Sequence, residues 1–102
     1  MQRGLRMTRS ELRVAVVQSV TLIATRHGFK GVVEDSVSII DALGLDSLRM
    51  VDLTVELEDR LGVAAFPMQD WVDAEAESVI GVRYTVGSLI ACASGLCLPL
   101  SD

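Results

Sequence analysis

A single serine, Ser47, stands at the expected first turn of a helix, directly after the acidic residue Asp46. Asp46 is a good N-cap residue, because its carboxylate can accept a hydrogen bond from a free backbone N–H of the first turn. Residues 47–61 contain no proline or glycine, which favours a helix of about four turns. The Ser47 hydroxyl would lie at the positive end of the helix dipole, where a covalently attached phosphate is stabilised.

The sequence Leu-Gly-Leu-Asp-Ser-Leu at 43–48 resembles the attachment site of acyl carrier proteins, in which Leu-Gly-x-Asp-Ser-Leu surrounds the modified serine. The resemblance extends over about 10–93. It implies that a phosphopantetheinyl transferase, using coenzyme A and Mg²⁺, joins a 4′-phosphopantetheine arm to Ser47. The thiol of the arm would hold an acyl chain as a thioester and present it to acyl-transfer or synthase enzymes. The implied pathways are fatty-acid, lipid or polyketide-type synthesis.

The helix after Ser47 divides into a core face and an exposed row. Apolar residues at i, i+3, i+7 and i+11 are expected to face the core, with two neighbours beside them: Met50, Leu53, Leu57 and Leu61, then Val51 and Thr54. The resemblance implies that partner enzymes dock through basic patches on a second set: Leu48, Asp52, Val55, Glu58 and Asp59. It also implies that Asp46 orients the transferase. Charges at such a rim steer encounter and specificity while the contacts stay weak.

The residue types do not predict an enzyme. Ser47 is not part of a Gly-x-Ser-x-Gly nucleophile elbow, and the single histidine, His27, lies at the far end of the first expected helix. One histidine and two late cysteines, Cys92 and Cys97, provide neither a metal-ligand set nor a disulfide framework. Ser47 is therefore interpreted as a substrate for modification and not as a nucleophile.

Charge limits the possible partners. The net charge is −5, and eight acids lie between Glu34 and Asp59 against Arg49 alone. This field repels nucleic acid and anionic membranes and attracts proteins with basic patches. Four arginines near the start, without aromatic residues among them, are a poor nucleic-acid signal: Arg3, Arg6, Arg9 and Arg13. We expect a monomer that binds proteins and no nucleic acid.

Hydropathy gives no targeting or membrane segment. The apolar run 14–24 is interrupted by polar residues, and the run 86–100 is short of the roughly 20 residues that a membrane span needs. We therefore expect a cytoplasmic protein without stable membrane insertion. Half of the residues are hydrophobic but only 4% are aromatic, which implies a core of Leu, Val, Ile and Ala. Such a core could open a slot for an aliphatic guest.

Helical spacing predicts an all-α fold, a small four-helix bundle of the acyl-carrier type. The expected helices cover about 8–26, 47–61, 68–77 and 85–95, with a Thr8–Glu11 capping box and stops at Gly28 and Gly62. The long connection 29–45 would be anchored by its apolar residues: Val37, Ile39, Ile40 and Leu43. Alternation over 32–40 suggests a strand, but a lone strand cannot satisfy its backbone. We expect one domain over 1–102, its core at about 8–95 and its termini flexible.

Three features depart from the general carriers. Arg49 is more like the carriers of polyketide and nonribosomal peptide systems, and the N-terminal arginines are atypical. The stretch 67–85 is longer than the usual short third helix and contains Trp71. That expansion resembles the carriers of very long acyl chains in lipid A assembly. A specialised, stand-alone carrier is expected, and two alternatives stay open: an aminoacyl or peptidyl carrier, and an unmodified helical adaptor that docks through its acidic face.

Overall fold

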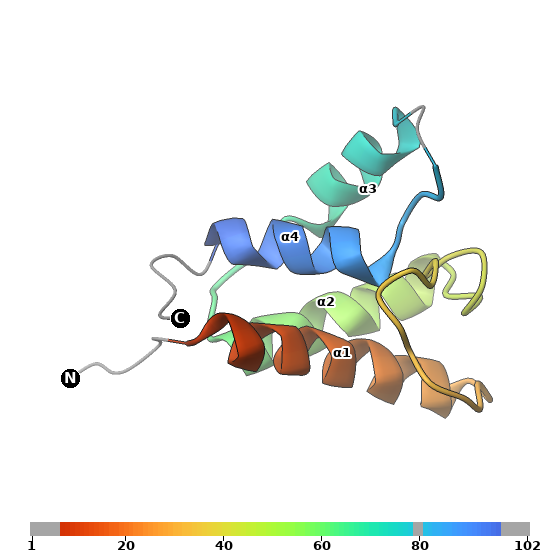
Figure 1. Cartoon of the computed structure of the whole chain (residues 1–102), viewed down its shortest axis with the longest axis horizontal. Coiled ribbons are helices and arrows are strands. Elements are labelled where there is room, and N and C mark those ends of the chain that lie inside the picture. Colours follow the sequence, from red (N-terminus) through yellow and green to blue (C-terminus); the bar gives the residue numbers. More distant parts are fainter. Residues whose placement is uncertain (1–6, 79–80, 97–102) are drawn as a thin grey trace.

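The computed structural model describes residues 7–78 and 81–96, which form an all-helical fold. Its four helices are α1 (Arg9–Arg26), α2 (Ser47–Leu61), α3 (Met68–Ala76) and α4 (Val86–Leu96). Helix α1 packs against both α2 and α4, while α3 leans away from the other three (Figure 1). No strand occurs in the described residues, and an isolated bridge joins Ser38 to Thr85. The predicted all-α bundle is confirmed, and so is the rejection of a strand at 32–40.

Helix α1 begins with the predicted capping box. The Glu11 backbone N–H donates to the Thr8 hydroxyl at 3.0 Å, and the Glu11 carboxylate accepts from the Thr8 backbone N–H at 2.9 Å. These two bonds satisfy backbone groups that a helix start otherwise leaves free. Apolar residues on one side of α1 are almost completely buried and supply the centre of the core: Leu12, Val16, Val20, Ile23 and Ala24.

Helix α2 has the predicted ends and the predicted core face. It ends at Gly62, which adopts the left-handed conformation (φ 69°) and donates its backbone N–H to the Glu58 carbonyl at 3.0 Å. The residues expected in the core are buried: Met50, Leu53, Leu57 and Leu61. Thr54 lies half-buried beside them, but the placement of Val51 there was wrong, since its side chain is 58% exposed. Each residue turns a helix by about 100°, so Val51 points well away from the face that contains Met50.

The long connection between α1 and α2 is held against the start of α4. The Ile39 backbone N–H donates to the Tyr84 carbonyl at 2.8 Å, and the Val86 N–H donates to the Val37 carbonyl at 3.0 Å. The Gly87 N–H donates to the Asp35 carbonyl at 2.9 Å. Of the predicted apolar anchors, two are buried and two half-buried: Ile39 and Leu43, then Val37 and Ile40. Backbone groups of the connection are thus paired with the segment that leads into α4, without a sheet.

Helix α3 is attached to α4 by a network of polar groups that we call the α3 clamp (Trp71, Glu75, Tyr84 and Ser88). The Trp71 indole N–H donates to the Ser88 hydroxyl at 3.0 Å, which itself donates to the Glu75 carboxylate at 2.8 Å. The other Glu75 oxygen accepts from the Tyr84 backbone N–H at 2.7 Å, and the Tyr84 ring meets the Trp71 ring edge to face. The α3 clamp explains how the expanded stretch 67–85 is ordered.

Small differences separate the predicted and observed helix ends. Helix α3 stops at Ala76, because Glu77 serves as its C-cap, and α4 reaches Leu96, one residue beyond the expected end. Thr85 caps α4 as predicted, its hydroxyl accepting from the Ser88 N–H at 3.1 Å. The expected flexible termini and Cys97 lie outside the described residues.

Three properties of the described residues bear on function. None of their helices has the length and apolarity to cross a membrane. No group of three or more His, Cys, Asp or Glu in 7–78 and 81–96 is placed to hold a metal ion. Cys92 is half-buried. Its burial raises the pKa of its thiol, and the negative charge of Asp70 raises it further, so the reactive thiolate is disfavoured.

Candidate functional site

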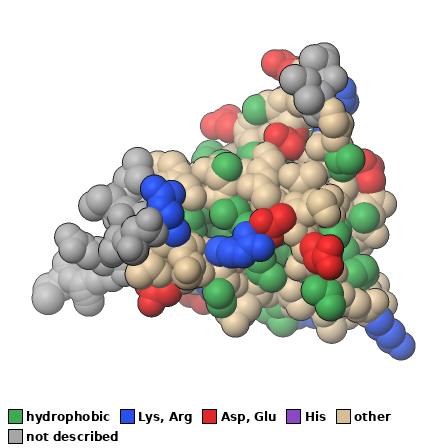
Figure 2. All heavy atoms as spheres, in the orientation of Figure 1, with side chains coloured by type: hydrophobic (Ala, Val, Ile, Leu, Met, Phe, Trp, Pro, Cys, Tyr) green, Lys and Arg blue, Asp and Glu red, His purple; other side chains and the backbone are tan. Residues whose placement is uncertain are grey.

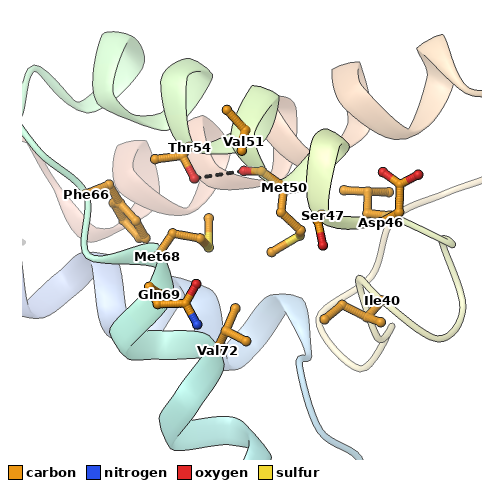
Figure 3. A pocket seen from close by; sticks show the side chains of 11 residues that line it. Ile40, Asp46, Ser47, Met50, Val51, Thr54, Phe66, Met68, Gln69 and Val72 are labelled. Carbon is orange, nitrogen blue, oxygen red and sulfur yellow. Dashed lines mark hydrogen bonds between the residues drawn. The ribbon is translucent and has the colours of Figure 1, made fainter.

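Ser47 is the first residue of α2, and its side chain is exposed to solvent. Figure 3 shows the hydroxyl projecting from the helix start into the space in front of Met50 and Ile40. No described residue forms a hydrogen bond with this hydroxyl. The Ser47 oxygen is therefore accessible to another protein, and modifying it breaks no hydrogen bond among the described residues.

Asp46 caps the helix at which Ser47 stands, as predicted. One oxygen of its carboxylate accepts from the Arg49 backbone N–H at 3.0 Å. This bond, and to a lesser degree the positive charge of Arg49, hold the pKa of Asp46 below its ordinary value. A negative charge at the first turn also complements the helix dipole, so the cap fixes both the position and the orientation of the residue that follows it.

His27 is a contact of this site that the sequence did not reveal. The Arg49 Nε–H donates to the His27 Nδ1 at 2.7 Å, which joins the end of α1 to the first turn of α2. The two residues are 22 positions apart in the chain, and no short-range pattern signals their contact. The bond gives Arg49 a fixed position near Ser47.

The carboxylates of Asp35 and Asp46 are expected to make the stability of the fold fall at acid pH. Hydrogen bonds from the Arg13 side chain hold the pKa of Asp35 below its ordinary value, as the cap does for Asp46. A lowered folded-state pKa adds stability that is present above the unfolded carboxyl pKa of about 4 and is lost as pH falls through the folded pKa. We expect the melting temperature of the wild type to decline below about pH 4 more steeply than that of an Asp35→Asn/Asp46→Asn variant. Parallel pH curves from circular dichroism melts would contradict this.

A hollow of about 700 Å³ opens beside Ser47, between α2 and the segment that leads into α3. Its walls are mostly apolar. The polar residues of the lining are Asp46, Ser47, Thr54 and Gln69, and the apolar ones are Ile40, Leu45, Met50, Val51, Phe66, Met68 and Val72. The Thr54 hydroxyl donates to the Met50 carbonyl at 2.8 Å, so it presents little unmet polarity to the hollow (Figure 3). The apolar walls suit an elongated aliphatic molecule whose polar end is near the Ser47 hydroxyl, and Gln69 adds a polar group on the far side of the hollow (Figure 3).

The exposed row on α2 consists of Leu48, Asp52, Val55 and Asp59, and we call it the docking row. Its apolar members are unusually open for such side chains, Leu48 being 62% and Val55 59% exposed. Asp52 and Asp59 are exposed and form no ion pair or hydrogen bond with the described residues. Val51, 58% exposed, lies between this row and the hollow that it also lines. An apolar surface with free carboxylates is thus continuous with the surroundings of Ser47.

Glu58, also predicted to bind partners, has a structural contact as well. Its side chain is half-buried, and its carboxylate accepts from the Phe66 backbone N–H at 2.9 Å. Phe66 is buried and forms part of the hollow, so Glu58 helps to position one of its walls. Whether Glu58 also meets a partner stays a prediction. Its backbone contact was not readable from the sequence, since it depends on how the chain turns after Gly62.

Comparison with known proteins gives one match. The model of a family described as "phosphopantetheine attachment site" matches residues 17–71, which is more than half of the chain. The matched range contains all of α2 with Ser47 and most of the hollow's lining. No curated protein and no solved structure matches the chain.

Proposed function

The chain belongs to the phosphopantetheine-attachment family of carrier proteins, and from this premise we propose that Ser47 carries the 4′-phosphopantetheine arm. The observation that supports the assignment is the exposed Ser47 hydroxyl, which has no hydrogen-bond partner in the described fold and stands at a capped helix start. Domains of this family hold the arm covalently and supply no catalytic step. When attached, the arm provides a thiol that forms thioesters.

The residues around Ser47 fit such an arm. A phosphate ester on this hydroxyl would lie at the positive end of the α2 dipole, where negative charge is stabilised. The Asp46 cap keeps the hydroxyl outside the helix and would orient the transferase. The adjoining hollow, with its apolar walls, provides a place in which a chain attached to the arm can be shielded from water.

The proposed cargo is an acyl chain, for use in fatty-acid, lipid or polyketide-type synthesis. The hollow supports an aliphatic cargo, because burying apolar surface contributes roughly 0.8 kcal/mol per CH₂ group. A charged aminoacyl group would lose solvation against the apolar walls, and among the lining residues its ammonium could pair with one carboxylate, that of Asp46, which already caps α2. Loading by an acyl-ACP synthetase, compared with loading by adenylation enzymes, distinguishes the acyl carrier from the aminoacyl or peptidyl carrier.

The proposal is tested by incubating the purified chain with coenzyme A, Mg²⁺ and a promiscuous phosphopantetheinyl transferase. Intact-mass spectrometry should show the addition of one arm, and fragmentation should place it on the peptide that contains Ser47. A wild-type chain that remains unmodified, while a known carrier in the same tube is modified, would overturn the proposal.

The docking row is proposed to meet basic patches on the transferase and on acyl-transfer or synthase enzymes. Replacing both free acids, Asp52→Lys/Asp59→Lys, should raise the KM for the transferase by on the order of tenfold at low salt and leave kcat unchanged. The matched control, Asp73→Lys/Glu77→Lys, makes the same change in net charge on α3 and at its C-cap. Equal KM values for the two double variants would show that overall charge, and not this row, governs docking.

A further inference from the structure

The acids of α2 are not equally available to a partner. The Glu56 carboxylate accepts from the Arg60 Nε–H at 2.7 Å, and this pair is only partly exposed, at 23% for Glu56 and 32% for Arg60. Glu58 is bound to the Phe66 backbone, as described above. On the face seen in Figure 2, on which α1 lies in front of α2, acidic and basic side chains are scattered and form no continuous acidic patch. The α2 carboxylates without a hydrogen-bond or ion-pair partner among the described residues are therefore Asp52 and Asp59.

Arg60 is fixed in place by a second helix. Its Nη1–H donates to the Gln18 side-chain oxygen at 2.9 Å, so the guanidinium bridges α1 and α2. The guanidinium also borders a shallow hollow of about 470 Å³ that has no acidic residue in its lining: Gln18, Thr21, Leu22 and Thr25. Residues 14–25 of α1 carry no charge at all. Glu56 thus supplies the carboxylate that pairs with Arg60. On its α1 side the Arg60 guanidinium faces uncharged residues.

Two fixed cations consequently lie beside the docking row, on the side of α2 that faces α1. Arg49, held by His27, stands next to its first residue, and Arg60 directly follows its last. Asp52 and Asp59 are seven positions apart, which is about 10 Å along a helix. The row therefore presents two anionic points of defined spacing, with a cation beside each end of it on the α1 side.

We propose that Arg60 determines specificity in docking, by weakening the binding of partners whose basic patch extends beyond Asp59 toward α1. A partner with two cations about two helical turns apart can pair them with Asp52 and Asp59 and stay clear of Arg60. In a partner with a longer basic surface, further cations come close to Arg60 and are repelled by it. Like charges at an interface rim act on encounter and specificity more than on maximal affinity. The inference rests on the proposed function, since it concerns the partners of that same site.

The test uses two labelled helical leucine–lysine peptides and fluorescence anisotropy, so that it does not require the arm to be attached. In one peptide lysines run along a whole side, and in the other only two lysines stand seven positions apart. For the first peptide, Arg60→Gln should lower Kd roughly two- to fivefold at low salt, and the gain should vanish at high salt. For the second peptide, Kd should not change.

Matched variants separate a local effect from net charge. Arg83→Gln removes one exposed cation elsewhere and should leave both Kd values unchanged, and Arg60→Lys should behave as wild type. Removing both partners, Glu56→Gln/Arg60→Gln, should return Kd close to the wild-type value, because the pair is neutral as a whole. Equal Kd values for wild type and Arg60→Gln, equal gains for Arg60→Gln and Arg83→Gln, or no binding of the first peptide would overturn the inference. Failure of the transferase assay, with these peptide results intact, would overturn only the proposed function.

Discussion

Ser47→Ala is expected to abolish attachment of the phosphopantetheine arm completely and to leave the fold unchanged. The arm needs an oxygen nucleophile, and alanine removes the only oxygen of that side chain. The fold should not respond, because the Ser47 hydroxyl is exposed and has no hydrogen-bond partner among the described residues. Alanine is also a better helix former than serine. Intact mass after the transferase reaction gives the first result, and circular dichroism the second.

A control serine makes the Ser47 result specific. Ser36 is also exposed but lies in the long connection and not at a helix start, so Ser36→Ala should be modified like the wild type. An arm found on Ser47→Ala would contradict the assignment of the site, even if the protein remains a carrier. If Ser47→Ala proves silent in cells while Asp52→Lys/Asp59→Lys abolishes function, the unmodified adaptor becomes the better interpretation.

Trp71→Ala is expected to have the largest effect on stability. Trp71 is 5% exposed and joins the core to the α3 clamp through its ring and its indole N–H. Truncating a buried Trp to Ala costs about 3–5 kcal/mol, against a total of roughly 5–15 kcal/mol for a domain. The loss should also free α3, and with it the wall of the hollow to which Met68, Gln69 and Val72 contribute. Urea unfolding followed by circular dichroism measures the change.

Two comparison variants resolve the contributions of Trp71. Trp71→Phe keeps a ring but removes the hydrogen bond to Ser88, and should cost less than Trp71→Ala. Gln69→Ala changes an exposed residue of the same helix, whose described hydrogen bond is to the neighbouring Asp73. It should shift the free energy of unfolding by no more than about 0.5 kcal/mol. A Trp71→Ala protein as stable as Gln69→Ala would show that α3 contributes little to folding.

Most of the bundle was predictable from short-range patterns, but the longer-range contacts of the charged residues of α2 were not. The capping box of α1, the Asp46 cap and the Gly62 stop all involve residues within four positions of one another. The Glu56–Arg60 pair is also of this short range (i, i+4), but Glu58 binds the Phe66 backbone 8 positions away and Arg60 binds Gln18 42 positions away. Val51 was misplaced for a related reason, since an apolar residue beside a core face need not be covered.

The sequence by itself determined the helices, their caps, the core face of α2 and the place of Ser47 at a helix start, because each depends on the backbone and on neighbours one turn away. Only the tertiary structure decided that the Ser47 hydroxyl has no described hydrogen-bond partner and that a hollow opens beside it. The same holds for Asp52 and Asp59, which have no hydrogen-bond or ion-pair partner among the described residues. It also brought His27 to Arg49 and Trp71 to Ser88, pairs that are 22 and 17 positions apart. Such contacts follow from how whole helices pack, and a one-dimensional pattern does not encode which distant side chains then meet.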